Sequence, residues 1–161
     1  MEMSMGHFYY IEDQYYIDFS DDKLMQNKEK INGQPHNRPC FFAFKDVSTN
    51  LYWMIPISSQ VEKFREYYNS KVARYGKCDT IVFGEVLGFE KAFLIQNMCP
   101  ITEKYVKNEY IDSRTSVPVR IDGRLESELI NKAKRVLALQ RTGVNLIFPD
   151  VLKIEREILD R

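Results

Sequence analysis

Two short segments of the sequence carry side chains that could do chemistry and have no evident role in a core. One is "PHNRP", which contains His36 and Arg38, and the other is "SSQVEK", which contains Ser58, Ser59 and Lys63. The first segment precedes a predicted strand, and the second follows the strand predicted to pair with it in a hairpin. We therefore expect these side chains to share one rim of a sheet.

A set of histidine, hydroxyls and cations suits phosphate chemistry that needs no metal. Cations and helix N–H groups stabilise a pentacoordinate phosphorane, while a histidine or hydroxyl relays protons. This favours a ribonuclease in which the 2′-hydroxyl of the RNA itself attacks, because that reaction needs the least machinery. Ser59 and Ser58, at a predicted helix start, would face the phosphate.

Motifs of several other enzyme classes are absent from the sequence. It holds no G-x-S-x-G, no phosphate-binding glycine motif, no H-E-x-x-H and no C-x-x-C, and nothing points to the paired carboxylates of a glycosidase. The three cysteines, Cys40, Cys78 and Cys99, have unrelated spacings, which favours reduced, buried thiols over a disulfide frame or zinc site. We expect neither a metal nor a small-molecule cofactor.

Each candidate residue also has a plainer interpretation. Ser59 and Glu62 fit the S-x-x-E capping box, in which the serine caps the helix and the glutamate reaches back. His36 could be a loop histidine bonded to backbone, Arg38 a surface cation at a strand edge, and Lys63 a solvated partner of a neighbouring side chain. A cap and a phosphate site are compatible at one helix terminus.

The elements that must position these residues follow from the hydrophobic pattern. Polar residues 21–37 are predicted to form a long loop, because Gly33 and Pro35 lie near its end. Helices are predicted as one or two turns within 12–20, from Gln60 to a stop at Gly76, from about 124 to 141, and after the "FPD" of 148–150. Strands are predicted within residues 7–11, 38–46, 50–58, 79–88, 90–97 and 117–121.

The chain of 161 residues suits a single α+β domain, built on an antiparallel, barrel-like sheet with added helices. No segment approaches the roughly 18 apolar residues that a membrane span needs. The start, "MEMSMGHFYYIED", lacks the basic and then apolar segments of a secretory signal. We expect a cytoplasmic protein.

The charges balance at 23 basic and 23 acidic residues, which taken alone argues against a nucleic-acid partner. Their distribution is uneven, since residues 62–77 and 131–141 are rich in cations and the N-terminal segment is acidic. Such segregation permits one basic surface. The residues that we expect to contact RNA are Asn37, Gln60, Arg65, Lys71, Arg74, Lys132, Lys134 and Arg135.

Four segments, "HFYYI", "NRPCFFAFKD", "YWMIPISS" and "FLIQNMCPIT", resemble in order and spacing the ToxN/AbiQ-like endoribonuclease toxins of type III toxin–antitoxin systems. The resemblance is strongest to the CptN branch and runs from about residue 7 to the end. It implies an extended SH3-like barrel akin to Kid and MazF, with added helices. It also implies metal-independent cleavage of single-stranded RNA, inhibition by a repeat pseudoknot RNA antitoxin that the toxin itself processes, and closed protein–RNA assemblies.

The resemblance also assigns roles to the candidate residues. Ser59 matches the active-site serine of the family, and Ser58 matches the threonine just before it. The family lysine two positions after the serine is a valine here, so Lys63, one turn on, is expected to take its role. Arg38 matches a basic residue at the mouth of the preceding strand. The family's upstream tyrosine has no clean counterpart, and His36 is the nearest reactive group.

The leading hypothesis is thus an endoribonuclease toxin that a structured RNA neutralises. A second hypothesis is a non-catalytic RNA-binding module on the same small barrel, using the basic helix face and tyrosines. A third is a domain that binds a protein partner, in which "SSQVE" serves only as a helix cap.

Overall fold

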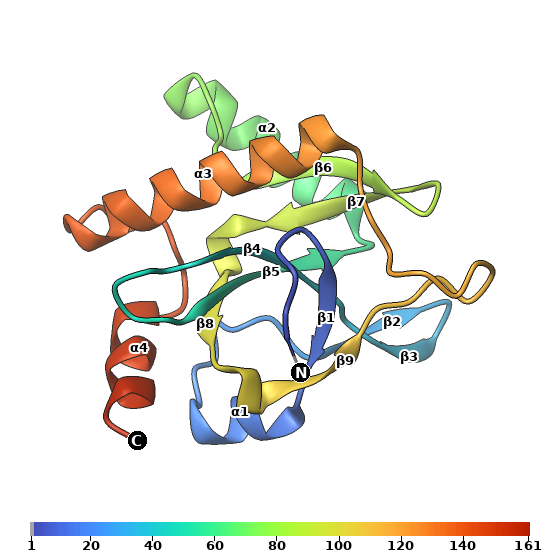
Figure 1. Ribbon diagram of the computed structural model, residues 1–161. Coiled ribbons are helices and arrows are strands. Elements are labelled where there is room, and N and C mark those ends of the chain that lie inside the picture. Colours follow the sequence, from blue (N-terminus) through green and yellow to red (C-terminus); the bar gives the residue numbers. More distant parts are fainter. Residues whose placement is uncertain (1) are drawn as a thin grey trace.

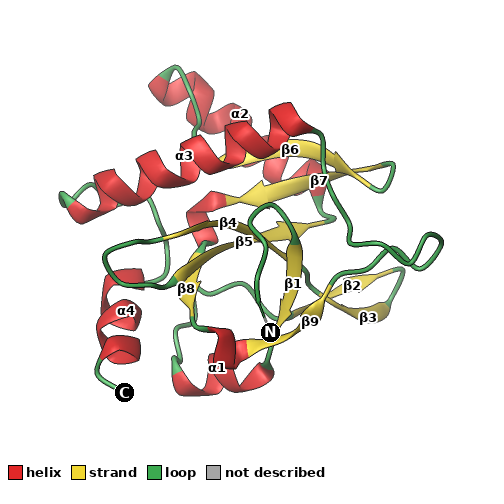
Figure 2. Ribbon diagram, in the orientation of Figure 1, coloured by secondary structure: helices red, strands yellow, loops and turns green. Residues whose placement is uncertain are grey.

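The computed structural model describes residues 2–161, and an antiparallel sheet with helices on both sides forms the centre of this part (Figure 1). Figure 2 shows the helices and strands in the same orientation. The helices are α1 (Asp13–Asp18), α2 (Val61–Tyr75), α3 (Gly123–Arg141) and α4 (Val151–Leu159). The strands are β1 (Phe8–Ile11), β2 (Lys28–Ile31), β3 (Gln34–Asn37), β4 (Cys40–Lys45), β5 (Tyr52–Ser58), β6 (Ile81–Val86), β7 (Phe89–Leu94), β8 (Cys99–Ile101) and β9 (Val106–Glu109).

The main sheet is open. Its strands run in the order β6-β7-β5-β4-β1-β9, and β8 pairs with β5 beside this path. All these pairs are antiparallel, and β6 and β9 lie at opposite ends. An SH3-like barrel needs a closed arrangement of strands. The α+β class is confirmed, whereas the closed barrel that we expected is not.

Most predicted elements are confirmed, including the hairpin that presents the candidate site. Strands β4 and β5 pair with Phe41 opposite Ile55, and a turn within residues 46–51 joins them. Helix α2 then starts at Val61 and ends at Gly76, whose φ of 82° is left-handed. A glycine accepts this conformation without strain, which is why it ends the helix.

Two segments differ from the prediction. Residues 21–37 are not one long loop, because β2 and β3 form a hairpin around Asn32 and Gly33. Both residues have positive φ, 53° and 78°, as a two-residue hairpin turn requires. Residues 117–121 form no strand, and only an isolated bridge joins Ile111 to Pro118. The sheet edge beside β1 is taken by β9 instead.

Apolar side chains are buried on both faces of the sheet, which explains why its strands read as nearly continuous hydrophobic runs. On one face, Phe41 and Trp53 belong to the same core cluster as Leu129 and Ala133 of α3. On the other, Phe42 belongs to a cluster covered by α1 and α4. Alternate residues of a strand point to opposite faces, as Phe41 and Phe42 do. Helix α2 packs separately on β6 and β7.

The cysteine prediction is confirmed, because Cys40, Cys78 and Cys99 are free and buried. Burial raises the pKa of the Cys99 thiol to about 12. No helix in the described residues is long and apolar enough to span a membrane. Within residues 2–161, no cluster of three or more His, Cys, Asp or Glu side chains could hold a metal ion.

Candidate active site

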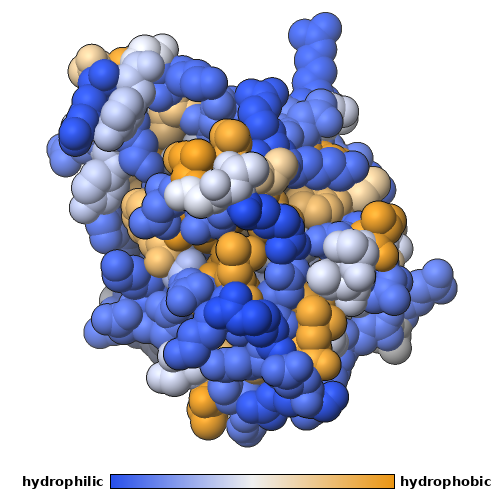
Figure 3. Space-filling model, turned by 90° about the vertical axis from the view of Figure 1, so that its left-hand side faces the viewer, coloured by the Kyte–Doolittle hydropathy of each residue, from blue (hydrophilic) through white to orange (hydrophobic). Residues whose placement is uncertain are grey.

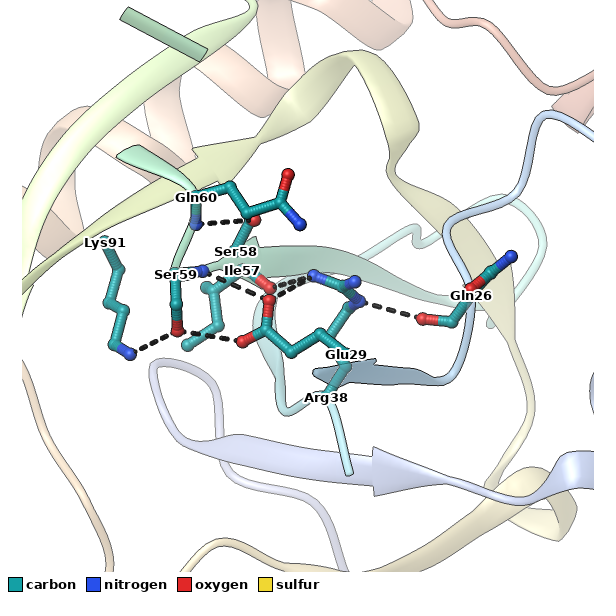
Figure 4. A network of polar contacts seen from close by, with 8 residues as sticks. All are labelled: Gln26, Glu29, Arg38, Ile57, Ser58, Ser59, Gln60 and Lys91. Carbon is teal, nitrogen blue, oxygen red and sulfur yellow. Dashed lines mark hydrogen bonds and ion pairs between the residues drawn. The ribbon is translucent and has the colours of Figure 1, made fainter. Parts of the chain in front are cut away.

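Ser59 lies at the junction between β5 and α2, and its hydroxyl joins two charged side chains (Figure 4). The Nζ atom of Lys91 donates to Ser59 Oγ at 2.6 Å, and Ser59 Oγ donates to Oε1 of Glu29 at 2.9 Å. The Ser59 N–H also donates to Oε2 of Glu29, at 3.2 Å. The hydroxyl is therefore held between an ammonium group and a carboxylate.

The carboxylate is fixed in turn by Arg38. The Nη1 atom of Arg38 lies 3.2 Å from Oε2 of Glu29 and also donates to the Ile57 carbonyl at 2.7 Å. The Nε atom of Arg38 donates to the Gln26 carbonyl at 2.8 Å. Both charged side chains are only 7% exposed. Buried ion pairs persist when further hydrogen bonds satisfy their remaining groups, as the two carbonyls do here. Arg38 is thus a buried residue that ties the β2–β3 hairpin to β5, and the surface-cation interpretation is wrong.

The sheet brings these residues together from four separate strands or turns. Strand β7 pairs with β5 through Ala92 opposite Ser58, so the preceding Lys91 lies beside Ser59. Glu29 belongs to β2, where it stands opposite His36 of β3. Directly opposite residues of an antiparallel pair share one face of the ribbon. The hairpin therefore delivers both a carboxylate and an imidazole to the same region.

A cavity of about 240 Å³ opens beside this network. Glu29, His36, Asn37 and Lys91 supply its polar wall. Its other lining residues are mostly aromatic or aliphatic: Tyr10, Ile31, Pro39, Ile57, Val86, Leu87, Phe89 and Tyr110. A concave site with a few convergent polar groups is the usual form of a ligand site.

Two phenols face each other in this cavity. The rings of Tyr10 and Tyr110 lie with their centroids 5.6 Å apart. Burial, with a smaller contribution from Tyr110, raises the pKa of Tyr10 to about 12. Tyr10 therefore stays protonated at neutral pH and can donate a hydrogen bond to a ligand.

Helix α2 is not capped as the sequence predicted. Its N-cap residue is Gln60, with no side-chain cap, so Ser59 and Glu62 do not form a capping box. Ser58 is buried, and its hydroxyl accepts a hydrogen bond from the Gln60 N–H at 3.1 Å. Ser58 therefore supports the turn into the helix, while the Ser59 hydroxyl is directed to Glu29 and Lys91.

Lys63 is not brought to Ser59. It is exposed in the first turn of α2, and its Nζ lies 5.4 Å from the centre of the Phe64 ring. The ammonium group beside Ser59 belongs to Lys91, a residue that the sequence analysis did not select. His36 is exposed and lines the cavity together with Glu29 and Lys91, the two residues that contact the Ser59 hydroxyl.

Several of the expected RNA contacts on α2 are already engaged within the protein. Arg65 pairs with Glu90 at 2.9 Å and stacks on Phe83, with 3.8 Å between the guanidinium carbon and the ring centre. Lys71 donates to Thr80 and Gln96 at 3.0 Å each. Arg74 and Gln60 are exposed, and Asn37 lines the cavity.

The expected contacts on α3 are partly neutralised. Lys132 lies 2.8 Å from Glu128 and 4.0 Å from Asp79, and Arg135 lies 3.6 Å from Asp79. Lys134 is exposed, with its Nζ 5.9 Å from the centre of the Phe44 ring. Lys132 and Arg135 thus lie close to Asp79, as does Lys77, whereas Arg65 and Lys134 lie elsewhere on the surface.

Two residues of the network, Glu29 and Lys91, are not among the residues selected from the sequence, and they differ in how strongly the sequence signals them. Glu29 could have been found, because "KEKINGQPHN" has the Asn-Gly signature of a two-residue hairpin, and that turn sets Glu29 opposite His36. Lys91 lies within a strand-like segment and has no such signal. Only the pairing of β7 with β5 makes it a neighbour of Ser59.

Comparison with known proteins gives a structural likeness and no match in sequence. No family model matches the sequence, and no curated protein matches it. The fold is similar to that of AbiQ, a lactococcal anti-phage endoribonuclease belonging to the type III toxin–antitoxin system. That similarity has a TM-score of 0.57 and 14% sequence identity, and it covers 83% of this chain and 81% of AbiQ. It supports no assignment to the CptN branch.

Proposed function

We propose that the protein is an endoribonuclease toxin of a type III toxin–antitoxin system, which cuts single-stranded RNA by attack of the 2′-hydroxyl on the adjacent phosphate. The observation that carries the proposal is the Ser59 hydroxyl, held by Lys91 and Glu29 next to a cavity that also contains His36. The fold likeness to an endoribonuclease toxin supports it. The CptN resemblance rests on sequence segments alone, and the proposal does not depend on it.

In the proposed reaction, the scissile phosphate binds in the cavity beside Lys91, within reach of the Ser59 hydroxyl that Lys91 contacts. A bond forms between the 2′-oxygen and phosphorus, and the bond to the 5′-oxygen breaks. His36 accepts the proton of the 2′-hydroxyl. The Ser59 hydroxyl turns from Glu29 to donate its proton to the leaving 5′-oxygen and takes a proton from Lys91 in return. The Lys91 ammonium group stabilises the negative charge of the phosphorane, which is the stage at which such a contact lowers the barrier most.

Glu29 and Arg38 act as positioning residues in this scheme. Glu29 accepts from both the hydroxyl and the N–H of Ser59, which fixes the direction of the hydroxyl. Arg38 fixes Glu29 from the other side. During the reaction the hydroxyl must turn from Glu29 toward the leaving oxygen, while the hydrogen bond from the Ser59 N–H to Glu29 keeps the residue in place.

A non-catalytic RNA-binding module is the second candidate. It is favoured by the fact that the Ser59 hydroxyl already has both a donor and an acceptor within the protein. In that case the network would be structural, and the cavity would bind a base without cutting the chain. A cleavage assay separates the two candidates.

The direct test is incubation of the purified protein with single-stranded RNA, with and without a chelator of divalent cations. We expect cleavage in both conditions, with a 2′,3′-cyclic phosphate and a 5′-hydroxyl as product ends. Ser59→Ala should lower the rate by about 100-fold or more and stay folded, because Ser59 caps no helix. Ser70→Ala, on the exposed side of α2, is the matched control.

Three outcomes of this assay would contradict the mechanism. They are loss of activity with chelator, cleavage at a 2′-deoxy position, and full activity of folded Ser59→Ala protein. RNA binding without any cleavage would instead favour the second candidate.

The toxin–antitoxin part of the proposal needs a cellular test. We expect a repeated, pseudoknot-forming RNA to be encoded directly upstream of the reading frame, to be processed by the protein, and to form a closed assembly with it. Expression of the protein alone should stop growth, and co-expression of that RNA should restore it. Growth that is unaffected in both cases would refute the toxin role. The nuclease activity would still be decided by the assay with purified protein.

A further inference from the structure

A second cavity, of about 410 Å³, lies between the C-terminal halves of α2 and α3. We call it the α2–α3 groove. Cys78, Asp79 and Thr80, which follow α2, line it together with Phe148 and residues 144–146, which follow α3. Ser59 precedes α2 and Tyr75 ends it, and a 15-residue helix is about 22 Å long. The groove is therefore well separated from the candidate active site.

Apolar side chains in the groove remain open to solvent. Tyr75 is 65% exposed, Phe148 49%, Val144 45% and Leu139 39%. Figure 3 views the side of the molecule where α3 and α4 end, and apolar side chains lie there among hydrophilic ones. Single exposed apolar residues are ordinary, whereas several around one cavity mark a binding surface.

The exposed Phe148 ring is held in place by its backbone. The Phe148 N–H donates to the Gln96 carbonyl at 2.8 Å. The N–H groups of Leu146 and Ile147 donate to Oε1 of Gln140 at 2.7 and 2.9 Å. The segment after α3 therefore presents a preformed aromatic platform.

Cations surround this platform. Lys71, Lys77 and Arg135 line the groove, and among its lining residues, all of them in the described part of the chain, Asp79 is the one acid. Lys77 and Arg135 lie 3.3 and 3.6 Å from that same aspartate, so one carboxylate is shared and the groove keeps a positive excess.

Each of the two aromatic rings also has a cation close to it. Lys71 Nζ lies 5.4 Å from the centre of the Phe148 ring, and the Arg74 guanidinium carbon lies 5.1 Å from that of Tyr75. Aromatic faces beside cations are the features that bind single-stranded nucleic acid, because bases stack on the rings and phosphates meet the charges. A purely apolar ligand would use only the rings, and a simple anion only the cations, whereas a nucleotide uses both.

We propose that the α2–α3 groove binds nucleotides of single-stranded RNA and holds them away from the site of cleavage. The inference rests on the proposed function and adds to it a separate binding site. A base would stack on Tyr75 or Phe148, and its phosphate would meet Lys77 and Arg135. RNA that enters this groove is retained without being cut, because no Ser59-like network lies there.

The test uses a fluorescent 2′-O-methyl oligonucleotide, which binds but cannot be cut, and measures its anisotropy at several salt concentrations. Tyr75→Ala should weaken binding about tenfold, as expected for loss of one stacked base. Tyr67→Ala is the matched control, since Tyr67 is an exposed tyrosine of the same helix outside the groove. Lys77→Glu should weaken binding and flatten its salt dependence.

A dinucleotide substrate distinguishes the groove from the active site. It is too short to span both, so Tyr75→Ala should cut it at the wild-type rate. Wild-type affinity in both Tyr75→Ala and Lys77→Glu would overturn the groove proposal and leave the proposed function standing. Loss of binding in these variants, in a protein that cuts no RNA, would support the groove and refute the nuclease. Tyr75 is exposed at a helix end, so its variant should fold.

Discussion

Two clusters in this protein each pair an arginine with a buried glutamate, and they differ in what remains available. At the candidate active site, Arg38 meets Glu29 through a single nitrogen at 3.2 Å. Near the C-terminus, Arg141 meets Glu155 through two nitrogens, at 2.8 and 2.7 Å, and also Asp46 at 2.8 Å.

The second cluster is saturated and joins three elements. Arg141 is the last residue of α3, Glu155 belongs to α4, and Asp46 follows β4. Hydrogen bonding to Glu155, opposed by partial burial, raises the pKa of Arg141. Two-nitrogen pairing is geometrically specific and strong, which suits a structural role.

The first cluster leaves hydrogen-bonding groups available for a reactive side chain. The other hydrogen bonds of Arg38 go to backbone carbonyls, so one oxygen of Glu29 stays available to Ser59. Ser59 also accepts a hydrogen bond from Lys91, which lines the cavity. The comparison teaches that a buried ion pair alone does not identify a site. The informative feature is a reactive hydroxyl that contacts both the pair and a lysine that lines a cavity.

The difference between the two clusters is tested most directly by removing the ammonium group of Lys91. Lys91→Met should lower RNA cleavage by about 100- to 1000-fold, the range for loss of one group that stabilises transition-state charge. Urea unfolding should change little, because Lys91 is half-buried with an aliphatic stem that methionine can replace. The measurement is single-turnover cleavage at saturating enzyme.

Lys63→Met is the companion variant, since the sequence pattern pointed to Lys63 and the structure places Lys91 beside Ser59. We expect Lys63→Met to retain most of the activity. A large loss in Lys63→Met with none in Lys91→Met would mean that the site rearranges when RNA binds.

The saturated cluster predicts the opposite pattern. Arg141→Met leaves Glu155, which is only 8% exposed, without its partner. Leaving a buried charged group unsatisfied costs about 2 kcal/mol or more, so the unfolding free energy should fall by that amount. Urea denaturation measures it, with Arg156→Met, an exposed arginine of α4, as the control. Cleavage by the folded variant should be unchanged, and a selective loss of cleavage would show that the two clusters are coupled.

The smallest expected effect is the contribution of Asp46 to the stability of the fold at low pH. Burial alone would raise the pKa of Asp46, but hydrogen bonds from Ser48 and Arg141 outweigh it and lower that pKa. A carboxyl group whose pKa is lower in the folded state stabilises the protein above its ordinary pKa, near 4, and this contribution is lost as the pH falls through the folded-state value.

Asp46→Asn should therefore lower stability at neutral pH and make the further decline between about pH 5 and pH 2 shallower. Urea unfolding at several pH values tests this, with the exposed Asp22→Asn as the control. An unchanged slope would indicate that other carboxyl groups dominate the acid response.

The sequence predicted the parts of the fold that depend on local pattern. Helix α2 and its stop at Gly76, helix α3, helix α4 and the β4–β5 hairpin all follow from periodicity and turn residues. Sheet closure depends on which distant strands become neighbours, and no local pattern encodes that. The same limit explains why the local pattern predicts a strand at residues 117–121, whereas the edge position beside β1 is occupied by β9.

Of the residues selected from the sequence, Ser59 and Arg38 both contact Glu29, and His36 lines the cavity beside them; their catalytic roles stay predictions. The sequence could not indicate Lys91, since a lysine within a strand usually marks only a solvated face. The capping interpretation failed because Glu29, from a different hairpin, accepts both the N–H and the hydroxyl of Ser59. Roles that depend on tertiary neighbours are thus beyond local pattern.

The β2–β3 hairpin has one further consequence. Its two strands pair only with each other, and it is joined to the main sheet largely through Arg38 and Glu29. A two-stranded hairpin is marginally stable by itself, so we expect this element to open before the main sheet, once its contacts to β5 are lost. When it lifts away, Ser59 loses its carboxylate while the sheet and its helices stay folded. On heating, RNA cleavage should therefore be lost at a lower temperature than the one at which the main sheet and its helices unfold.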